Sequence, residues 1–110
     1  MPWKIEFYNK KVENNIREWP PGLIAKFAWL SNVIETFGPD EIGMPHIKSL
    51  KKGLFEIRVK AKEGIARAIF CLHKGKIIII LNGFIKKTEK TPINELELAY
   101  ARMKEVQEND

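Results

Sequence analysis

Two arginines, Arg58 and Arg67, lie in the segment "GLFEIRVKAKEGIARAIF" at residues 53–70. The segment is typical of two short antiparallel strands joined by a turn at "AKEG". If Lys60 and Ile65 flank the turn and pair, Arg58 falls directly opposite Arg67 on one face of the hairpin. Opposed like charges destabilise a sheet by a few tenths to about 1 kcal/mol, so this pair is not explained by stability. Because a guanidinium binds phosphate oxygens through two hydrogen bonds, the pair predicts a phosphate site.

The next strand predicts further members of the same face. Extending the register across a two-residue turn at Lys74 and Gly75 places Asn82 beside Arg67 and directs Phe84 and Lys86 the same way. We therefore expect a cationic, solvent-facing side of the sheet.

Two more titratable groups lie near the arginines in sequence. Glu56 shares a face with Arg58 and could simply form a surface ion pair with it. His46, in the loop before the hairpin, could exchange a proton near neutral pH. Neither histidine of the chain has a ligand-spaced partner, and the one cysteine, Cys71, has apolar neighbours. We expect a buried thiol, no metal and no cofactor.

Basic residues are concentrated in the middle of the chain. Residues 46–91 hold 12 Lys or Arg against 3 Glu, whereas the remaining 64 residues hold 7 basic against 11 acidic residues. This asymmetry favours a polyanionic partner over general solubility, although scattered solvated lysines are the simpler alternative. The lysines that we assign to docking of a nucleic-acid backbone are Lys48, Lys51, Lys52, Lys60, Lys87 and Lys90.

The order of the expected strands and helices predicts an α+β fold in a single domain over residues 1–110. We expect a strand at 3–8, a helix capped by Asn9, a helix at 23–37, a loop or short edge element at 39–53, strands at 54–60, 65–72 and 76–86, and a helix capped by Thr91. The prediction is a small antiparallel sheet of about four strands, with an N-terminal helical hairpin and a C-terminal helix packed on one face. Trp29 falls off the apolar stripe of its helix, so it either widens the core or marks a partner surface.

Three motifs carry a resemblance to a known family. They are "GLFEIR" at 53–58, "IAR" at 65–67 and "GFIKKTEKTP" at 83–92. With the rest of residues 42–103, they resemble the HigB-like, phage-derived branch of the RelE/ParE superfamily of toxin–antitoxin toxins.

The resemblance implies a ribosome-dependent mRNA endonuclease that acts without a metal, by attack of a 2′-hydroxyl on the adjacent phosphate. Arg58 and Arg67 would then clamp the phosphate, and Lys86 or Lys87 would contact it. Related nucleases often carry a Tyr or a His/Asp/Tyr cluster near the C-terminal end, and "IKKTEKTPINE" has neither His nor Tyr. The general base is therefore open, with Glu56, His46 and Glu89 as candidates in that order.

The resemblance also implies partners: a cognate antitoxin with a helix-turn-helix DNA-binding domain, the ribosome and mRNA. ParE-like relatives instead inhibit DNA gyrase by protein contact, and a catalytically degenerate basic binding module is a third reading. The N-terminus resembles no signal peptide, and the longest apolar run, Ile77 to Leu81, is far short of a membrane span, so we expect a cytoplasmic protein without membrane contact.

Overall fold

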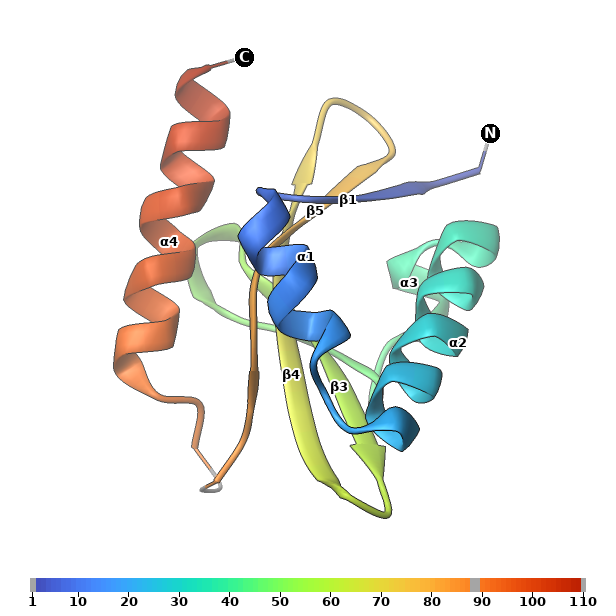
Figure 1. Cartoon of the computed structure of the whole chain (residues 1–110). Helices are drawn as coiled ribbons and strands as arrows, with labels where there is room; N and C mark the ends of the chain where they lie inside the picture. Colours follow the sequence, from blue (N-terminus) through green and yellow to red (C-terminus); the bar gives the residue numbers. More distant parts are fainter. Residues whose placement is uncertain (1, 88–89, 110) are drawn as a thin grey trace.

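The structure is a computed structural model that describes residues 2–87 and 90–109. Its elements are β1 (Lys4–Phe7), α1 (Lys10–Arg17), α2 (Pro21–Phe37), α3 (Pro39–Ile42), β2 (Ile47–Ser49), the 3₁₀ turn η1 (Lys51–Gly53), β3 (Phe55–Ala61), β4 (Gly64–His73), β5 (Ile77–Ile85) and α4 (Ile93–Glu108). Figure 1 shows them in one view.

The strands form one five-stranded sheet in the order β1-β5-β4-β3-β2. The predicted α+β class is confirmed, but the sheet has five strands rather than four and is mixed, because β1 runs parallel to β5. Two helices follow β1, so no short hairpin forces it to be antiparallel to its neighbour. The fifth strand, β2, pairs through only three residues at the sheet edge, so of the two alternatives for residues 39–53 the short edge element is present.

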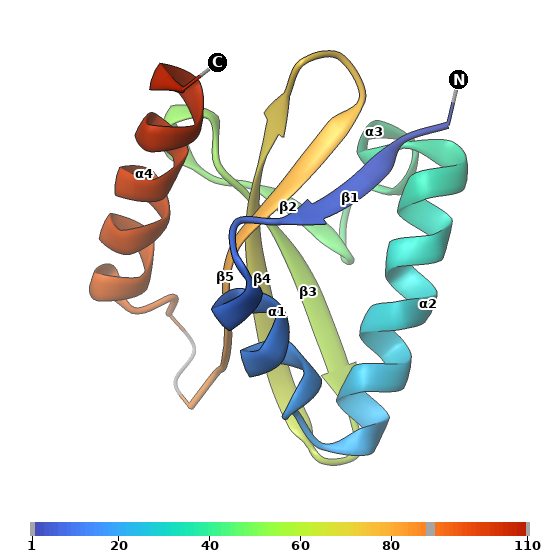
Figure 2. The ribbon, with the colours of Figure 1, turned by 45° about the horizontal axis from the view of Figure 1, so that its top comes forward.

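Helices cover both faces of the sheet, whereas the sequence predicted helices on one face only (Figures 1 and 2). The helices α1 and α2 pack over one face, with Leu23 and Phe27 against Ile57 and Phe70. The helix α4 packs over part of the other face, through the cluster Leu54, Ile69, Cys71, Ile79, Leu81, Ala99 and Met103. The central strands are apolar on both sides, and an apolar second face has to be covered.

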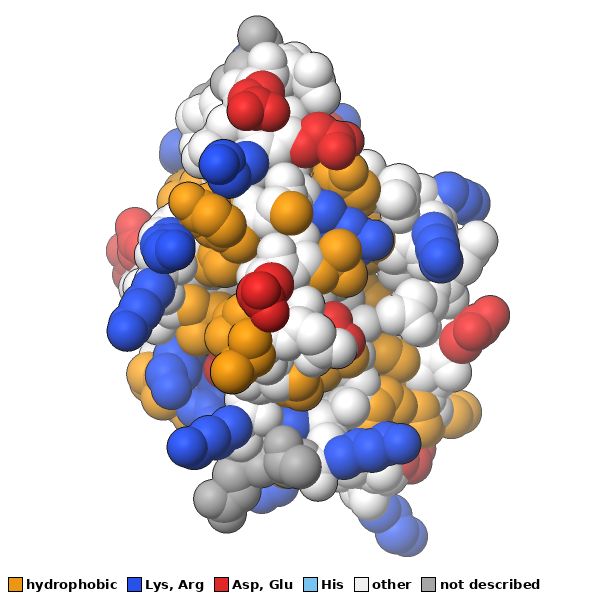
Figure 3. Space-filling view, turned by 90° about the vertical axis from the view of Figure 1, so that its left-hand side faces the viewer, with side chains coloured by type: hydrophobic (Ala, Val, Ile, Leu, Met, Phe, Trp, Pro, Cys, Tyr) orange, Lys and Arg blue, Asp and Glu red, His pale blue; other side chains and the backbone are white. Residues whose placement is uncertain are grey.

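The covering helix leaves a mixed surface. Figure 3, viewed from the side of α4, shows exposed hydrophobic side chains among cationic and anionic ones. Ile93 and Leu98 of α4 are among the exposed hydrophobic residues. The sheet face that the sequence predicted to be cationic and open to solvent is therefore partly covered by α4, and the outer surface on this side is mixed.

Register confirms one prediction and corrects another. Arg58 pairs with Arg67 as expected, but Arg67 pairs on its other side with Phe84, and Asn82 pairs with Ile69. The β4–β5 connection has three residues instead of two, since His73 pairs with Ile77. That shift alone would turn Phe84 to the other face of the sheet.

A β-bulge restores the side-chain direction. Ile69 pairs with Asn82 while Phe70 pairs with Ile80, so Leu81 is an extra residue in β5. The extra residue reverses the alternation, and Asn82, Phe84 and Lys86 return to the face of Arg67. The face was predicted correctly, and the pairing partners differ by two residues.

Local signals had different outcomes. Asn9 caps α1 as predicted, because its Oδ1 accepts from the Val12 N–H at 2.8 Å. Thr91 does not cap α4; Pro92 stands at that position, and the Thr91 hydroxyl donates to Glu56 instead. Trp29 is 53% exposed, which contradicts the alternative that it widens the core. Cys71 is buried as predicted, and burial raises the pKa of its thiol to about 11.

Candidate active site

The centre of the site is the cross-strand pair Arg58 and Arg67, held side by side by the β3–β4 hairpin. The two side chains differ in exposure: that of Arg58 is 30% accessible, whereas Arg67 as a whole is 5% accessible. A solvent-facing Arg67 was therefore a wrong prediction. Because β4 is an inner strand, Arg58 on β3 and Phe84 on β5 flank Arg67 on both sides.

Glu56 is buried beneath the arginines rather than on the surface, with 2% of the residue exposed. Its Oε1 lies 3.6 Å from Arg67 Nε and 3.8 Å from Arg58 Nε, so it forms ion pairs with both. Its Oε2 accepts from Thr91 Oγ1 at 3.2 Å. At these lengths the ion pairs are not hydrogen bonds, so the carboxylate neutralises charge without occupying the guanidinium donors.

Arg67 retains hydrogen-bonding capacity in the site. Its Nη1 donates to the Ala66 carbonyl at 3.0 Å, while its Nε has no hydrogen-bond partner in the part of the chain that the structure describes. Burial lowers the pKa of Arg67, the charge of Glu56 raises it, and the nearby Arg58 lowers it. An arginine nevertheless stays charged in proteins. Arg67 also lines a cleft, so its guanidinium group can meet an anion there.

Lys86 completes the cationic cluster. Its backbone N–H donates to the Ile65 carbonyl at 2.7 Å, which fixes the chain just past β5 beside β4. Burial lowers the pKa of the Lys86 ammonium, the charges of Arg67, Arg58 and Lys48 lower it further, and Glu56 opposes them. The ammonium therefore gives up its proton more readily than an exposed lysine does.

A cleft of about 480 Å³ opens beside the two arginines. It is lined by Lys26, Pro45, His46, Arg58, Lys60, Ile65 and Arg67. The His46 carbonyl accepts from the Arg58 N–H at 2.7 Å, which ties the loop before β2 to the centre of β3. The structure thus brings His46 and Lys60 to the predicted arginine site. Lys26 comes from α2, and no sequence signal links it to this cleft.

The remaining predicted residues lie elsewhere or further out. Lys48 is exposed on β2 beside Glu56, and its charge contributes to the lowered pKa of Lys86. Lys51 is exposed in η1, and Lys52 Nζ lies 4.6 Å from the Tyr100 ring centroid on α4, so Lys52 packs against the helix. Lys87 and Lys90 are exposed. Glu89, the third candidate base, lies outside the described residues.

Within residues 2–87 and 90–109, no group of three His, Cys, Asp or Glu side chains could hold a metal ion. The cleft itself is lined by cations, which repel metal ions and attract anions. In the same described part of the chain, no helix is both long and apolar enough to cross a membrane.

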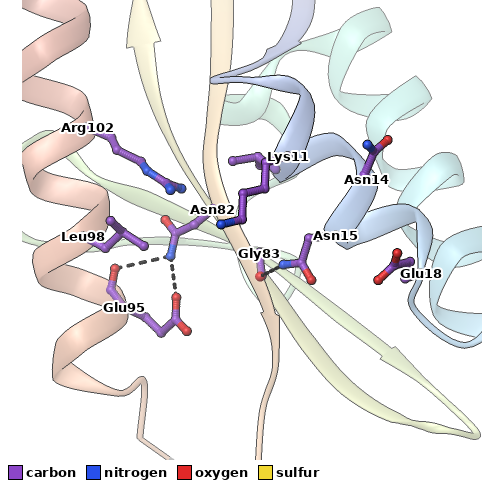
Figure 4. Close-up of a pocket in the computed structure, with 10 residues that line it drawn as sticks. Lys11, Asn14, Asn15, Glu18, Asn82, Gly83, Glu95, Leu98 and Arg102 are labelled. Carbon is purple, nitrogen blue, oxygen red and sulfur yellow. Dashed lines mark hydrogen bonds between the residues drawn. The ribbon is translucent and has the colours of Figure 1, made fainter.

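A second cavity, of about 660 Å³, lies between α1 and α4 at the end of β5 (Figure 4). Asn82 points from the floor to α4, and its Nδ2 donates to Glu95 Oε1 at 2.7 Å, while Asn15 Nδ2 donates to the Gly83 carbonyl at 2.7 Å. Arg102 Nη1 donates to the Leu81 carbonyl at 2.7 Å. These contacts bind the two helices to β5. Asn82 therefore anchors α4 and is not a partner of Arg67.

Residues 14–104 match the model of the family described as "Phage derived protein Gp49-like". The chain belongs to this Gp49-like family. The matched region contains both arginines, Glu56, Lys86 and the residues that line the cleft. No curated protein matches this Gp49-like chain.

A solved structure shares the fold. It is a chain from the crystal structure of the archaeal RelE–RelB complex of Pyrococcus horikoshii OT3, with a TM-score of 0.59 and 20% sequence identity. The alignment covers 79% of the Gp49-like chain and 98% of the archaeal chain. The resemblance to the RelE/ParE fold is confirmed at the level of architecture.

Proposed function

We propose that this Gp49-like protein is the toxin of a toxin–antitoxin pair, of the HigB-like kind, and that it cleaves ribosome-bound mRNA in the cytoplasm. In this reaction the RNA 2′-hydroxyl attacks the adjacent phosphorus and the bond to the 5′-oxygen breaks, which leaves a 2′,3′-cyclic phosphate and a 5′-hydroxyl. The Gp49-like family match and the RelE-like fold support the assignment to a toxin.

The observation that carries the nuclease proposal is the charge of the site. Arg58, Arg67 and Lys86 supply three cations around one carboxylate, Glu56. These four side chains therefore carry a net charge of two positive units, which is equal in magnitude and opposite in sign to the charge of a phosphorane dianion. Preorganised cations aimed at developing charge are a large source of rate enhancement in phosphoryl transfer. Excess positive charge around a buried arginine lowers the stability of the fold. Its presence here therefore favours a role in binding this anion.

Proton transfer requires a base for the 2′-hydroxyl and an acid for the 5′-oxygen. The burial of Glu56 supports a role in orienting the two arginines, whereas His46 lines the cleft and is the better-placed base. This assignment reverses the order of preference that the sequence supported. We propose Lys86 as the acid, because its lowered pKa eases proton donation.

The proposed antitoxin covers the cleft and contains a helix-turn-helix DNA-binding domain, as in the family that the sequence resembles. The structural relative was crystallised as a RelE–RelB complex, which supports a partner protein of this kind. Lys48 and Lys60 would add contacts to the ribosomal or messenger RNA backbone.

Primer-extension mapping of mRNA after brief induction tests the proposal. We expect new 5′ ends within translated codons, which disappear when a drug clears ribosomes from the message and in the Arg58→Ala variant. Intact mRNA together with arrested replication would instead identify a ParE-like inhibitor of DNA gyrase. Intact mRNA with unaffected growth would leave a degenerate binding module.

A further inference from the structure

An exposed tryptophan stands next to the cleft. Trp29 lies on α2, and its burial is incomplete although it is the largest side chain on that helix. Lys26 Nζ lies 4.9 Å from the centroid of the indole ring. The His46 ring approaches from another side, with centroids 6.4 Å apart and the planes at 80°. The indole is thus held in place by two polar neighbours rather than by the core.

Both neighbours of Trp29 belong to the cleft. Lys26 and His46 line it together with Arg58 and Arg67. His46 also accepts a hydrogen bond from the Arg58 backbone, so two successive contacts join the indole to the arginine pair. The rim of the cationic cleft therefore carries a flat aromatic surface that is still accessible to a ligand.

We propose that Trp29 stacks on an unpaired base of the RNA, next to the phosphate that Arg58 and Arg67 hold. This inference rests on the proposed function and adds a positioning residue to it. Single-stranded nucleic acids are bound by cationic grooves with aromatic side chains on which bases stack, because every base has a π-face. The cleft combines both features: cations for the phosphate and an indole for the base. Because Lys26 Nζ lies over one face of the indole ring, the base would stack on the opposite face.

Single-turnover cleavage of synthetic mRNAs on purified ribosomes tests the proposal. The mRNAs are unmodified or carry one abasic ribonucleotide near the cut phosphate, which removes a base but keeps the 2′-hydroxyl. We expect Trp29→Ala to slow cleavage of unmodified mRNA by about 5- to 150-fold at subsaturating protein, the range that loss of one stacked base implies. We expect Trp29→Phe to retain most of the activity.

The abasic substrates separate stacking from a general effect on the fold. At the stacked position, the missing base should slow the wild-type protein by the same factor and should not slow Trp29→Ala any further. Phe37→Ala is the matched control, because Phe37 is a 62% exposed aromatic residue on the same helix and does not line the cleft. Trp29→Leu, which keeps apolar bulk without a π-face, should behave as Trp29→Ala and replaces it if the alanine variant does not fold.

Two results would overturn this inference alone: cleavage by folded Trp29→Ala at the wild-type rate, or an abasic penalty that is the same in Trp29→Ala as in the wild type. Failure of the wild-type protein to cleave any ribosome-bound mRNA would overturn the proposed function, and this inference with it.

Discussion

At the scale of single residues, the two central arginines have different tasks although they form one pair. Arg67 is buried and is held near Glu56, whereas the Arg58 side chain is partly accessible at the wall of the cleft. A buried cation that loses its counter-charge destabilises a fold strongly, and an accessible one does so weakly. Arg58 is therefore the residue in which activity can be separated from stability.

Arg58→Ala should lower the single-turnover cleavage rate by about 100-fold or more, the effect of removing one donor to a transition-state oxyanion. Its urea midpoint should change little. Lys62→Ala, in the exposed turn of the same hairpin, is the control and should cleave normally. A folded Arg58→Ala variant with full activity would refute the phosphate clamp.

Lys86 should give the reaction a characteristic pH dependence. If the Lys86 ammonium is the acid, the alkaline side of the kcat/KM profile falls about tenfold per pH unit above the lowered pKa of Lys86. The fall should therefore begin below about pH 10.4, which is the ordinary pKa of a lysine side chain. Lys86→Arg keeps the charge, and an arginine is not deprotonated in proteins, so the profile of this variant should lack the alkaline fall. An unchanged alkaline profile in Lys86→Arg would assign the proton donor elsewhere.

At the scale of elements, the bulge in β5 decides which side chains face the site. Leu81 is the extra residue, and beyond it Gly83 faces α1 while Phe84 and Lys86 face the arginines. A Cβ on Gly83 would lie 2.8 Å from Ile16 Cγ1, so the helix packs directly on the strand backbone there. The close approach keeps β5 in the shifted register.

Gly83→Ala should lower the free energy of unfolding by about 1–3 kcal/mol, because the added methyl group overpacks the contact with α1. Ile16→Ala removes the two nearest atoms that the methyl group would meet, Cγ1 and Cδ1 of Ile16, and leaves the contact with Trp19 Cζ2 at 3.1 Å. The double variant should therefore be more stable than the sum of the two single effects predicts, as measured by urea denaturation. Strict additivity would contradict close packing at this site.

The buried Glu56 connects β3 to the segment before α4 through Thr91. Glu56→Gln keeps shape but leaves Arg67 without a nearby negative charge, so it should lower the free energy of unfolding by about 3 kcal/mol. Glu97→Gln, an exposed change on α4, should be neutral in the same urea titration. Wild-type stability in Glu56→Gln would mean that the ion pairs contribute little to the fold.

At the scale of the whole molecule, the net charge of +5 is distributed unevenly. The lysines and arginines that line the cleft come from α2 and from the β3–β4 hairpin. The acidic excess lies outside residues 46–91. A polyanion is therefore attracted to one side of the protein, which favours its approach in a defined orientation.

Ribosome binding should weaken steeply between about 50 and 200 mM salt, because each neutralised phosphate releases counterions. Lys60→Ala should reduce the slope of log affinity against log salt by about 1. Lys10→Ala is the control, since Lys10 pairs with Glu13 on α1, remote from the cleft lining. A salt-independent affinity in sedimentation assays would exclude electrostatic docking.

Two local features of the fold were predicted correctly from the sequence. The pairing of Arg58 with Arg67 follows from a short turn, and the start of α1 follows from the Asn9 cap, because both depend on hydrogen bonds between residues close in the chain. The burial of Arg67 and Glu56 and the hydrogen bond from Thr91 to Glu56 instead depend on the packing of segments that are distant in the chain.

The sequence also did not show that α4 covers the second face of the sheet or that Lys26 lies beside the arginines. These features join segments that are distant in the chain, and their energies depend on which apolar surfaces remain to be covered once the sheet has formed. The alternation of a strand specifies two faces, but it does not specify which element will cover each one. For that reason the sequence identified the arginine pair, and the packing of the helices determined its surroundings.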